Sequence, residues 1–259
     1  MAVIETKQES GLVPLERAPT YRLVHDAIER EILAGRLKIG DPLPAELQLA
    51  ERFKVNRSTV REGIRLLEKS GLVERKGGKR PRIAAPRYRD LASAASRALI
   101  LHAVTFRELW EASMVIEPST AEFAARNITE ADIAKLSANI AEMEESVERL
   151  ETGLEDKPDG FVDLDRKFHE LLVNATGNRV LILAHEPVTT LFIPAGRLIL
   201  PRLKTYRRVL DAHRHIFDFL KKRDPEGAGK WMHRHMDDFR RGYELTGLDF
   251  DTPLEMVNV

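Results

Sequence analysis

Residues Leu43–Arg82 read LPAELQLAERFKVNRSTVREGIRLLEKSGLVERKGGKRPR, and this stretch decides the fold of the chain. Its first part predicts a short helix that begins at Pro44-Ala45-Glu46 and carries its apolar residues on one face. A tight connection at Lys54-Val55-Asn56 follows, after which Asn56 or Ser58 can cap a second helix. The apolar positions are Leu47, Leu49, Ala50 and Phe53 in the first helix and Val60, Ile64, Leu66 and Leu67 in the second.

The polar face of the second helix predicts contact with nucleic acid. Arg57, Thr59, Arg61 and Arg65 lie largely off its apolar face. Two short helices joined by a few residues, the second beginning with Arg and Thr, form the helix-turn-helix arrangement. In that arrangement the second helix presents its N-terminal residues to base edges in the major groove.

The residues after Gly71 predict a β-hairpin. Leu72–Arg75 and Arg82–Ala84 read as short strands on either side of Lys76-Gly77-Gly78-Lys79-Arg80, a flexible and basic tip. A hairpin in this position is the wing of a winged helix-turn-helix. We therefore expect residues 18–85 to form that domain.

Charge supports DNA binding by this region. Twelve Lys and Arg residues stand against three Glu residues between Lys54 and Arg89, whereas the whole chain has 41 basic and 41 acidic residues. A concentrated basic patch on a neutral protein is what the neutralisation of phosphates requires. The alternative, a basic surface helix beside a lysine-rich turn, explains the helices but not the wing and the charge together.

The rest of the chain is expected to be helical. Residues 86–90 read as a linker, and from Leu91 onward Gly is sparse and apolar residues follow a helical period. Six or seven helices with short loops predict an all-α bundle over residues 91–248, so the fold class is mainly α with a small β wing. Pro187 and Pro194 are expected to kink or break the fifth of these helices. The expected helices span residues 91–101, 105–126, 130–152, 161–175, 178–199, 203–222 and 226–245, with loose tails at residues 1–17 and 249–259.

Composition limits the classes of protein that this chain can belong to. It contains no cysteine, which excludes disulfides, thiolate metal sites and cysteine nucleophiles. The apolar run at residues 180–184 is far shorter than the roughly 20 residues that span a bilayer. Residues 1–17 lack the hydrophobic region of a signal peptide. We expect a soluble cytoplasmic protein that does not bind membranes.

One constellation in the helical region could carry chemistry. Asp165 and His169 are four residues apart, so they share one face of a helix with Phe168 and Leu172. That face is apolar, and the pair is therefore expected to point inward. Buried Asp and His side chains each cost several kcal/mol unless they are paired or bind a ligand.

Helical phase selects two further histidines. His213 falls on the apolar face of its helix and His215 on the polar face, while His235 lies on an inner face and His233 on an outer one. One Asp and three His that converge inside a bundle are suitable ligands for Zn, Ni, Mn or Fe. Two alternatives remain: each His could be a core residue bonded to a neighbour, and Asp165–His169 could be a simple helical hydrogen-bonded pair.

Several separated blocks in the first domain resemble the GntR family of bacterial transcription regulators. They are Leu37–Glu46 (LKIGDPLPAE), Val55–Glu62 (VNRSTVRE) and Leu66–Val73 (LLEKSGLV), and the resemblance covers about residues 21–83. It implies that Arg57, Thr59 and Arg61 contact an operator and that Gly77-Gly78-Lys79 enters the minor groove. We expect Ser58 and Arg65 to lie at the same interface. Leu47 departs from the family, because some members carry a DNA-contacting Arg at that position.

The helical region resembles the FCD ligand-sensing domain of the FadR subfamily of GntR regulators. The matching pieces are Glu117-Pro118 with Ala124-Ala125, Asp165-xxx-His169-xx-Leu172, Thr176-Gly177-Asn178, His213-xx-Ile216 and His235. In metal-binding members the Asp, the His four residues later and two later His coordinate one ion. The resemblance therefore implies that Asp165, His169, His213 and His235 hold one divalent metal, with zinc as the first expectation.

The resemblance also bears on an effector. Many such domains carry Glu-x-Arg in the first long helix, where the Arg holds an effector carboxylate, but this chain has Glu111-Ala112-Ser113. Ser113 could donate a hydrogen bond but cannot form a bidentate charge pair. Arg197 could substitute, although a surface Arg is the simpler interpretation. A small organic acid is the expected effector, and the apolar residues 180–200 would also suit an acyl chain.

These observations favour a homodimeric regulator, with a repressor as the first expectation. Two-fold symmetry would present two winged helices to the half-sites of a near-palindromic operator, and an effector bound at or near the metal would alter DNA affinity. A metal-dependent hydrolase with a basic accessory domain is the alternative from another class, because such a metal could activate water. An architectural DNA-binding protein would show no effector and little sequence preference.

Overall fold

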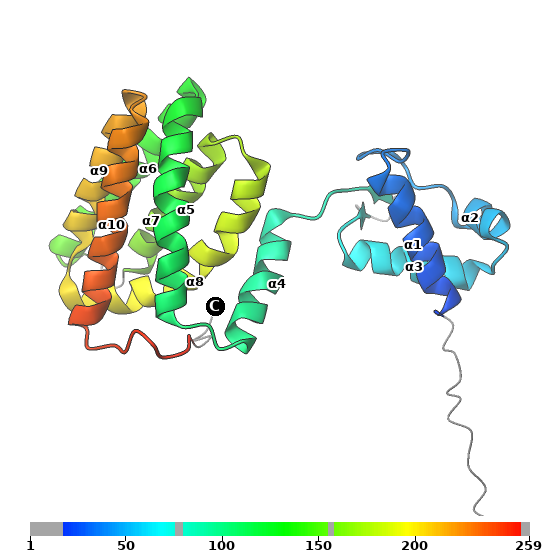
Figure 1. The fold of residues 1–259 in the computed structure, drawn as a ribbon. Coiled ribbons are helices and arrows are strands. Elements are labelled where there is room, and N and C mark those ends of the chain that lie inside the picture. Colours follow the sequence, from blue (N-terminus) through cyan, green and yellow to red (C-terminus); the bar gives the residue numbers. More distant parts are fainter. Residues whose placement is uncertain (1–17, 76–79, 155–157, 255–259) are drawn as a thin grey trace, which may run out of the picture. The chain divides into compact units, whose positions relative to one another are not determined.

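The computed structural model of the 259-residue chain describes residues 18–75, 80–154 and 158–254. The chain divides into two compact units, residues 1–87 and 88–259 (Figure 1). Among the described residues, the first unit contains three helices and one small sheet, and the second is built from helices. The mainly α fold class is confirmed.

The first unit is a winged helix-turn-helix. Its elements are α1 (Thr20–Leu33), α2 (Glu46–Phe53), α3 (Arg57–Lys69), β1 (Val73–Glu74) and β2 (Arg82–Ile83). The two strands pair antiparallel, with Val73 opposite Ile83, and are shorter than the sequence suggested. The tip residues Gly77, Gly78 and Lys79 lie outside the described residues.

Local sequence explains how α3 begins and how α1 packs on it. Asn56 is the N-cap of α3, and its side-chain oxygen accepts the backbone N–H of Thr59 at 2.8 Å. Gly63 in α3 allows α1 to approach closely, because a Cβ there would lie 2.8 Å from Cγ1 of Val24. The core of this unit consists of Val24, Ile28, Leu43, Leu49, Ala50, Val60, Ile64, Leu67, Val73 and Ile83.

The second unit is a bundle of long helices. Its elements are α4 (Tyr88–Leu101), α5 (Phe106–Asn127), α6 (Glu130–Glu151), α7 (Asp159–Ala175), α8 (Arg179–Leu203), α9 (Tyr206–Lys221) and α10 (Pro225–Leu245). Helix α5 packs against α7, α8, α9 and α10 and keeps one exposed face, which carries Val115. Helix α4 packs on α8 and begins inside the segment expected to be a linker.

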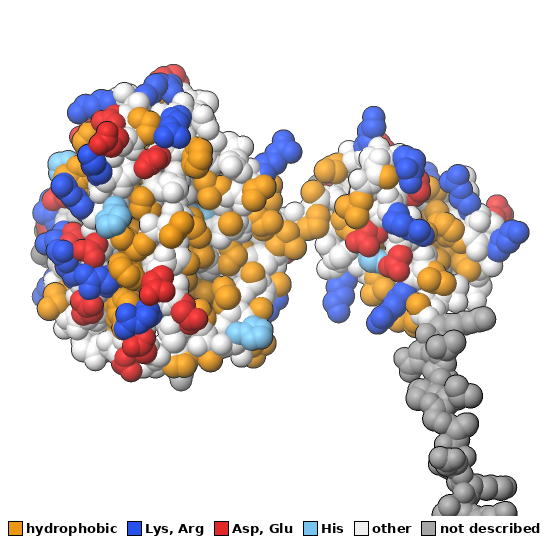
Figure 2. Space-filling view, in the orientation of Figure 1, with side chains coloured by type: hydrophobic (Ala, Val, Ile, Leu, Met, Phe, Trp, Pro, Cys, Tyr) orange, Lys and Arg blue, Asp and Glu red, His pale blue; other side chains and the backbone are white. Residues whose placement is uncertain are grey.

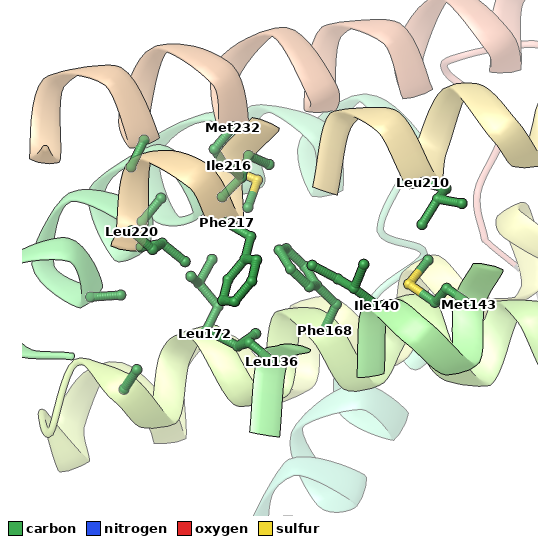
Figure 3. Close-up of a cluster of buried hydrophobic side chains, with 14 of the residues drawn as sticks. Leu136, Ile140, Met143, Phe168, Leu172, Leu210, Ile216, Phe217, Leu220 and Met232 are labelled. Atoms are coloured by element: carbon green, nitrogen blue, oxygen red, sulfur yellow. The ribbon is translucent and has the colours of Figure 1, made fainter. Parts of the chain in front are cut away.

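The largest hydrophobic core of this unit lies between α5, α6, α7, α9 and α10. Figure 3 shows Phe168 and Leu172 of α7 pointing toward Phe217 of α9 and Leu136 of α6. Phe168 is completely buried. This core fixes the rotation of α7, α9 and α10 about their axes, and Asp165, His169, His213 and His235 project from the same three helices.

Helix α8 shows which of the two effects expected of its prolines occurs. Pro187 and Pro194 do not break the helix, which continues through both, but Figure 1 shows it bending along its length, as expected for a kink. Its buried residues, such as Leu191 and Ile199, hold it on both sides of the prolines. Tertiary packing therefore outweighs the roughly 3 kcal/mol that a proline costs inside a helix. Neither α8 nor any other helix among the described residues is long and apolar enough to cross a membrane.

Residues 249–254, expected to belong to a tail, lie against the start of α5. Phe250 packs on Phe106 with ring centroids 5.0 Å apart, and its carbonyl accepts the backbone N–H of Arg107 at 3.0 Å. Arg107 also donates two hydrogen bonds to the Asp251 carboxylate, at 2.5 and 2.9 Å. We call residues 249–254 the C-terminal strap.

Candidate functional site

The bundle brings together the four side chains that the sequence selected as metal ligands. Asp165 and His169 project from α7, His213 from α9 and His235 from α10, and one ligand atom of each lies within 4.8 Å of the others. All three histidines are buried, whereas 27% of the Asp165 side chain remains exposed. The predicted phase of the two later helices is confirmed, because His215 and His233 are exposed.

The contacts within this group are close. The Nε2 atoms of His213 and His235 are 3.2 Å apart, and His213 Nε2 is 3.4 Å from Oδ1 of Asp165. The His213 ring stacks on Phe168 with centroids 3.9 Å apart, which ties the group to the hydrophobic core. Its Nδ1 is buried and has no hydrogen-bond partner among the described residues. The reactive edge of the ring therefore faces Asp165 and His235.

A buried glutamate stands behind His169. One oxygen of Glu117, in α5, lies 3.0 Å from Nδ1 of His169, and the other lies 2.8 Å from Nε2 of His185 in α8. The Glu117 side chain is 4% exposed and that of His185 is 1% exposed. Such a carboxylate fixes the orientation and tautomer of a metal-binding histidine from its far side. Glu117, His169 and His185 also lie close enough to hold an ion, but direct hydrogen bonds already occupy the facing atoms.

Electrostatics keep two of the imidazoles neutral. Burial, followed by the neighbouring imidazoles, lowers the pKa of His213 well below its ordinary value and that of His235 to about 3. Their Nε2 lone pairs are thus available near neutral pH. This is the protonation state in which histidine binds metals.

The pKa values of three groups beside the pocket, His169, Glu117 and Asp165, are shifted in other ways. Burial alone would lower the pKa of His169, but the charge of Glu117, the hydrogen bond to Glu117 and the charge of Asp165 together outweigh burial and raise that pKa to about 9. Burial opposes ionisation of Glu117, yet the charges of His185 and His169 outweigh it and lower its pKa. Burial raises the pKa of Asp165 to about 6. A positive charge is therefore favoured at this point, and a metal ion could supply it in place of the His169 proton.

The donor set fits a divalent metal of the first transition row. Three imidazoles and one carboxylate match zinc and its neighbours in ligand type. Asp165 reaches a pocket at its exposed side, so a ligand from solution could approach the same point. The site is thus compatible with a metal, and its composition alone does not distinguish zinc from nickel, manganese or iron.

A small pocket opens beside these residues. It has a cavity of about 40 Å³, and it is lined by Glu117, Val162, Asp165, Arg166, His169, Thr189, Phe192, Ile193, Gly196, His235, Met236 and Phe239. Arg166 is its only Lys or Arg among the described residues.

The two residues expected to bind an effector lie elsewhere. Ser113 is fully buried, and its hydroxyl donates to the Leu109 carbonyl at 2.9 Å. Arg197 forms an ion pair with Asp159 at 3.2 Å. Neither side chain lines the pocket that contains the candidate ligands.

The polar face of α3 is exposed in the first unit. Arg57, Ser58, Arg61 and Arg65 are all exposed, and Thr59 is half-buried. Lys and Arg side chains are spread over the visible face of this unit (Figure 2). Leu47, which replaces an Arg of some relatives, is 54% exposed near the start of α2. The arrangement suits a helix that enters a DNA groove with its first two turns.

Comparison with known proteins decides the family. Residues 20–83 match the bacterial regulatory proteins of the gntR family, and residues 108–238 match the FCD domain. The chain belongs to the GntR family and carries an FCD domain. It is therefore a transcription regulator that binds DNA through its helix-turn-helix, and not an enzyme. The metal-dependent hydrolase alternative is excluded by this assignment.

Individual relatives of this GntR regulator differ in the direction of regulation. It is 26% identical over 236 residues to the HTH-type transcriptional repressor NanR of Cronobacter sakazakii, covering 88% of this chain and 86% of that protein. It is 27% identical over 252 residues to the Glc operon transcriptional activator of Escherichia coli, covering 93% and 98%. The solved structure of Streptococcus agalactiae GntR matches with a TM-score of 0.60 and 26% identity, covering 85% of this chain and 99% of that one.

Sequence reasoning missed three residues of the regulator's site. Glu117 entered the sequence analysis only as part of a matching motif, and His185 directly follows the apolar run at residues 180–184. His185 shares a helix face with Thr189 and Phe192, at spacings of four and seven residues, and that period could have revealed it. Arg166 follows Asp165 directly, and nothing in the local pattern showed that it would border the pocket.

Proposed function

We propose that this regulator is a cytoplasmic repressor whose affinity for its operator falls when a small organic acid binds at a divalent metal ion. Asp165, His169, His213 and His235 would hold the ion. The observation that carries the proposal is the convergence of these four donors within 4.8 Å at the wall of a pocket. When bound, the ion would supply a centre of positive charge with coordination positions open to a carboxylate.

The pocket favours a small acid over an acyl chain. A cavity of about 40 Å³ accommodates about three water molecules, each of which needs about 10–15 Å³ by the same measure. This space suits a carboxylate with a few more atoms.

We assign Arg166 to bind the part of the acid that does not contact the metal, which is either the other end of the molecule or the remaining carboxylate oxygen. It lies in the pocket wall, and its guanidinium is 3.6 Å from Glu170, which also pairs with Lys167 at 3.1 Å. Because Glu170 has two cationic partners, Arg166 could turn to an anion in the pocket without leaving that carboxylate unpaired. This gives Arg166 the role that the sequence suggested for Arg197 or Ser113.

The DNA contacts would come from α3 and the wing. Arg57 and Arg61 are proposed to contact bases and phosphates, with Ser58, Thr59 and Arg65 beside them and Gly77, Gly78 and Lys79 in the minor groove. A homodimer would present two such units to a near-palindromic operator. Hydrophobic side chains gather on the surface around α4 (Figure 2), and this surface suits a second copy of the chain. Leu91 and Leu101 of α4 and Leu183 of α8 are among the exposed apolar residues of the bundle.

The decisive experiment measures DNA release by anisotropy. A duplex recovered from a random pool by the wild-type protein is labelled, and zinc-loaded protein is titrated with acetate, lactate, malonate or succinate. We expect at least one acid to weaken binding, its amide to have no effect, and the response to disappear after EDTA treatment. Equal responses in metal-free protein would contradict the metal's role, and no response to any acid in the series would contradict the small-acid effector.

A further inference from the structure

Glu46 lies between two of the arginines on the DNA-binding surface. Its carboxylate accepts hydrogen bonds from Arg61, with Nη2 at 2.9 Å and Nε at 3.4 Å, and lies 3.9 Å from Nη2 of Arg57. Glu46 is the first residue of α2, whereas both arginines belong to the first two turns of α3. The acid therefore links the helix that supports the recognition helix to the side chains that face DNA.

Two other ion pairs on this unit provide a comparison. Glu62 pairs with Arg65 at 2.6 Å within one helix, and both side chains are more than half exposed. Glu68 pairs with Arg75 at 3.2 Å beside the wing. Glu46 is 23% exposed, and the backbone of the residue before it is held because the Gln48 side chain accepts the N–H of Ala45 at 3.1 Å. Its carboxylate is thus a fixed point from which Arg61 can be oriented.

A carboxylate at this place has an electrostatic cost. The hydrogen bond from Arg61 is the main reason that the pKa of Glu46 lies below its ordinary value, so the group is ionised at neutral pH. A negative charge beside the phosphates of bound DNA is repelled within a Debye length of about 8–10 Å. It also cancels one of the positive charges that would otherwise displace counterions from any duplex.

The compensating gain is order in the arginine side chains. A free Arg side chain has considerable rotamer entropy, which it loses when its guanidinium docks on a guanine edge. An Arg that is already held in one orientation loses less. Only base contacts need that orientation, since a phosphate can be met by many rotamers.

We propose that Glu46 is a positioning residue that sets DNA specificity: it holds Arg61, and more loosely Arg57, ready for base contact while weakening non-specific binding. This inference rests on the proposed DNA contacts of Arg57 and Arg61. The ligand class is double-stranded DNA, and the effect of Glu46 is a larger ratio between specific and non-specific affinity.

The first test is Glu46→Gln. The probes are the duplex selected by the wild-type protein and a shuffled duplex of the same composition, each measured by anisotropy at several salt concentrations. We expect the affinity for the shuffled duplex to rise. The slope of log K against log salt concentration for that duplex should become steeper by about 0.9. The ratio of specific to non-specific affinity should fall by roughly 5- to 20-fold, a part of what one base contact contributes.

The variant Glu46→Asp separates position from charge. It keeps the negative charge and a favourable acidic residue in the first turn of α2, but its carboxylate is one methylene shorter. We expect non-specific affinity near the wild-type value and a reduced specificity ratio. Wild-type specificity in Glu46→Asp would overturn the positioning role. Glu62→Gln is the matched control, since it removes one acid from the same surface and should raise non-specific affinity with less loss of specificity.

A double-mutant cycle shows whether Glu46 acts through Arg61. In the Arg61→Ala background, Glu46→Gln should change the specificity ratio much less than in the wild type. An equal change in both backgrounds would overturn the inference, and thermal unfolding of each variant shows whether the fold is retained. If Arg61→Ala itself leaves binding to the selected duplex intact, the proposed DNA contact fails; if it weakens that binding and Glu46→Gln leaves the ratio unchanged, only the inference about Glu46 fails.

Discussion

Two glutamates in this regulator each bridge two basic side chains, in very different surroundings. Glu117 lies between His169 and His185 in the helical bundle with 4% of its side chain exposed, and Glu46 lies between Arg57 and Arg61 at 23% exposure. In the dry interior, removing one partner leaves a charge that nothing else can neutralise, which costs several kcal/mol. At the surface, water and ions replace the lost partner, so such pairs contribute at most about 1 kcal/mol.

This difference in burial suits the roles that we propose for the two glutamates. The interior glutamate can keep His169 in one orientation permanently, as a metal ligand requires. If Arg57 and Arg61 contact DNA as we propose, a guanine or a phosphate could replace the surface glutamate, because an exposed ion pair is weak. Burial, rather than residue type, therefore decides whether a glutamate between two basic side chains keeps both partners or can lose one of them to another ligand.

The strongest test of the interior centre is Asp165→Asn. It removes a charged donor while keeping the shape of a partly exposed side chain, so the fold should persist. We expect zinc affinity, measured by titration calorimetry after chelation, to fall by more than about 100-fold, since even supporting residues alter it by 10- to 100-fold. The exposed Asp163 on the same helix is the control, and Asp163→Asn should bind zinc like the wild type. Unchanged zinc affinity in Asp165→Asn would remove the carboxylate from the metal site.

Glu117→Gln tests the permanent bridge itself. The amide cannot accept hydrogen bonds from both histidines at once through two oxygens, so His169 loses its fixed orientation. We expect zinc affinity to fall by about 10- to 100-fold and the free energy of unfolding to fall by about 1–3 kcal/mol. Glu122→Gln, at a 43% exposed position on the same helix, should change neither quantity appreciably. If Glu117→Gln and Glu122→Gln change zinc affinity and the free energy of unfolding equally, burial does not distinguish buried from exposed glutamates here.

Arg57→Ala tests the surface side of the comparison. If Arg57 contacts a guanine, binding to the selected duplex should weaken by about 1–3 kcal/mol, with a smaller loss on a shuffled duplex. Zinc affinity should not change. Anisotropy at fixed salt provides both affinities, and retained affinity for the selected duplex would refute the proposed contact.

The C-terminal strap offers the same contrast on a smaller scale. Phe250 packs in an aromatic cluster with Phe106, Trp110 and Tyr243, whereas the nearby Arg107–Asp251 pair is exposed. Phe250→Ala should lower the free energy of unfolding by about 1–2 kcal/mol, less than a fully buried Phe would. Asp251→Asn should shift Tm by no more than about 2 °C. If calorimetry showed a larger loss of stability in Asp251→Asn than in Phe250→Ala, the expected order of the two contacts would be wrong.

Much of the fold was predictable because its signals are local. Asn56 precedes a run of apolar residues at helical spacing, and it caps α3 as expected. His213 and His235 were separated from their neighbours His215 and His233 by helical phase alone, since a period of 3.6 residues places them on opposite faces. The convergence of these two with Asp165 and His169 followed from the resemblance to the FCD domain rather than from phase.

The remaining features depend on contacts between distant parts of the chain. Glu117 meets His185 across 68 residues, and Phe250 meets Phe106 across the whole bundle sequence. Pro187 and Pro194 were expected to kink or break α8, and only the packing around Leu191 and Ile199 decides that the helix bends but stays continuous. No local pattern encodes which polar residue will face a given pocket, and Arg166 was missed for that reason.

From its own residues the chain determines a winged helix-turn-helix, a helical bundle and the inward direction of one aspartate and three histidines. These follow from spacing, capping and charge, which act over a few residues. Only the tertiary structure decides that Glu117 supports His169, that Arg166 borders the pocket and that Glu46 holds Arg61. Each of these depends on how helices far apart in the sequence rotate against one another, and that rotation is set by the packing of whole hydrophobic faces.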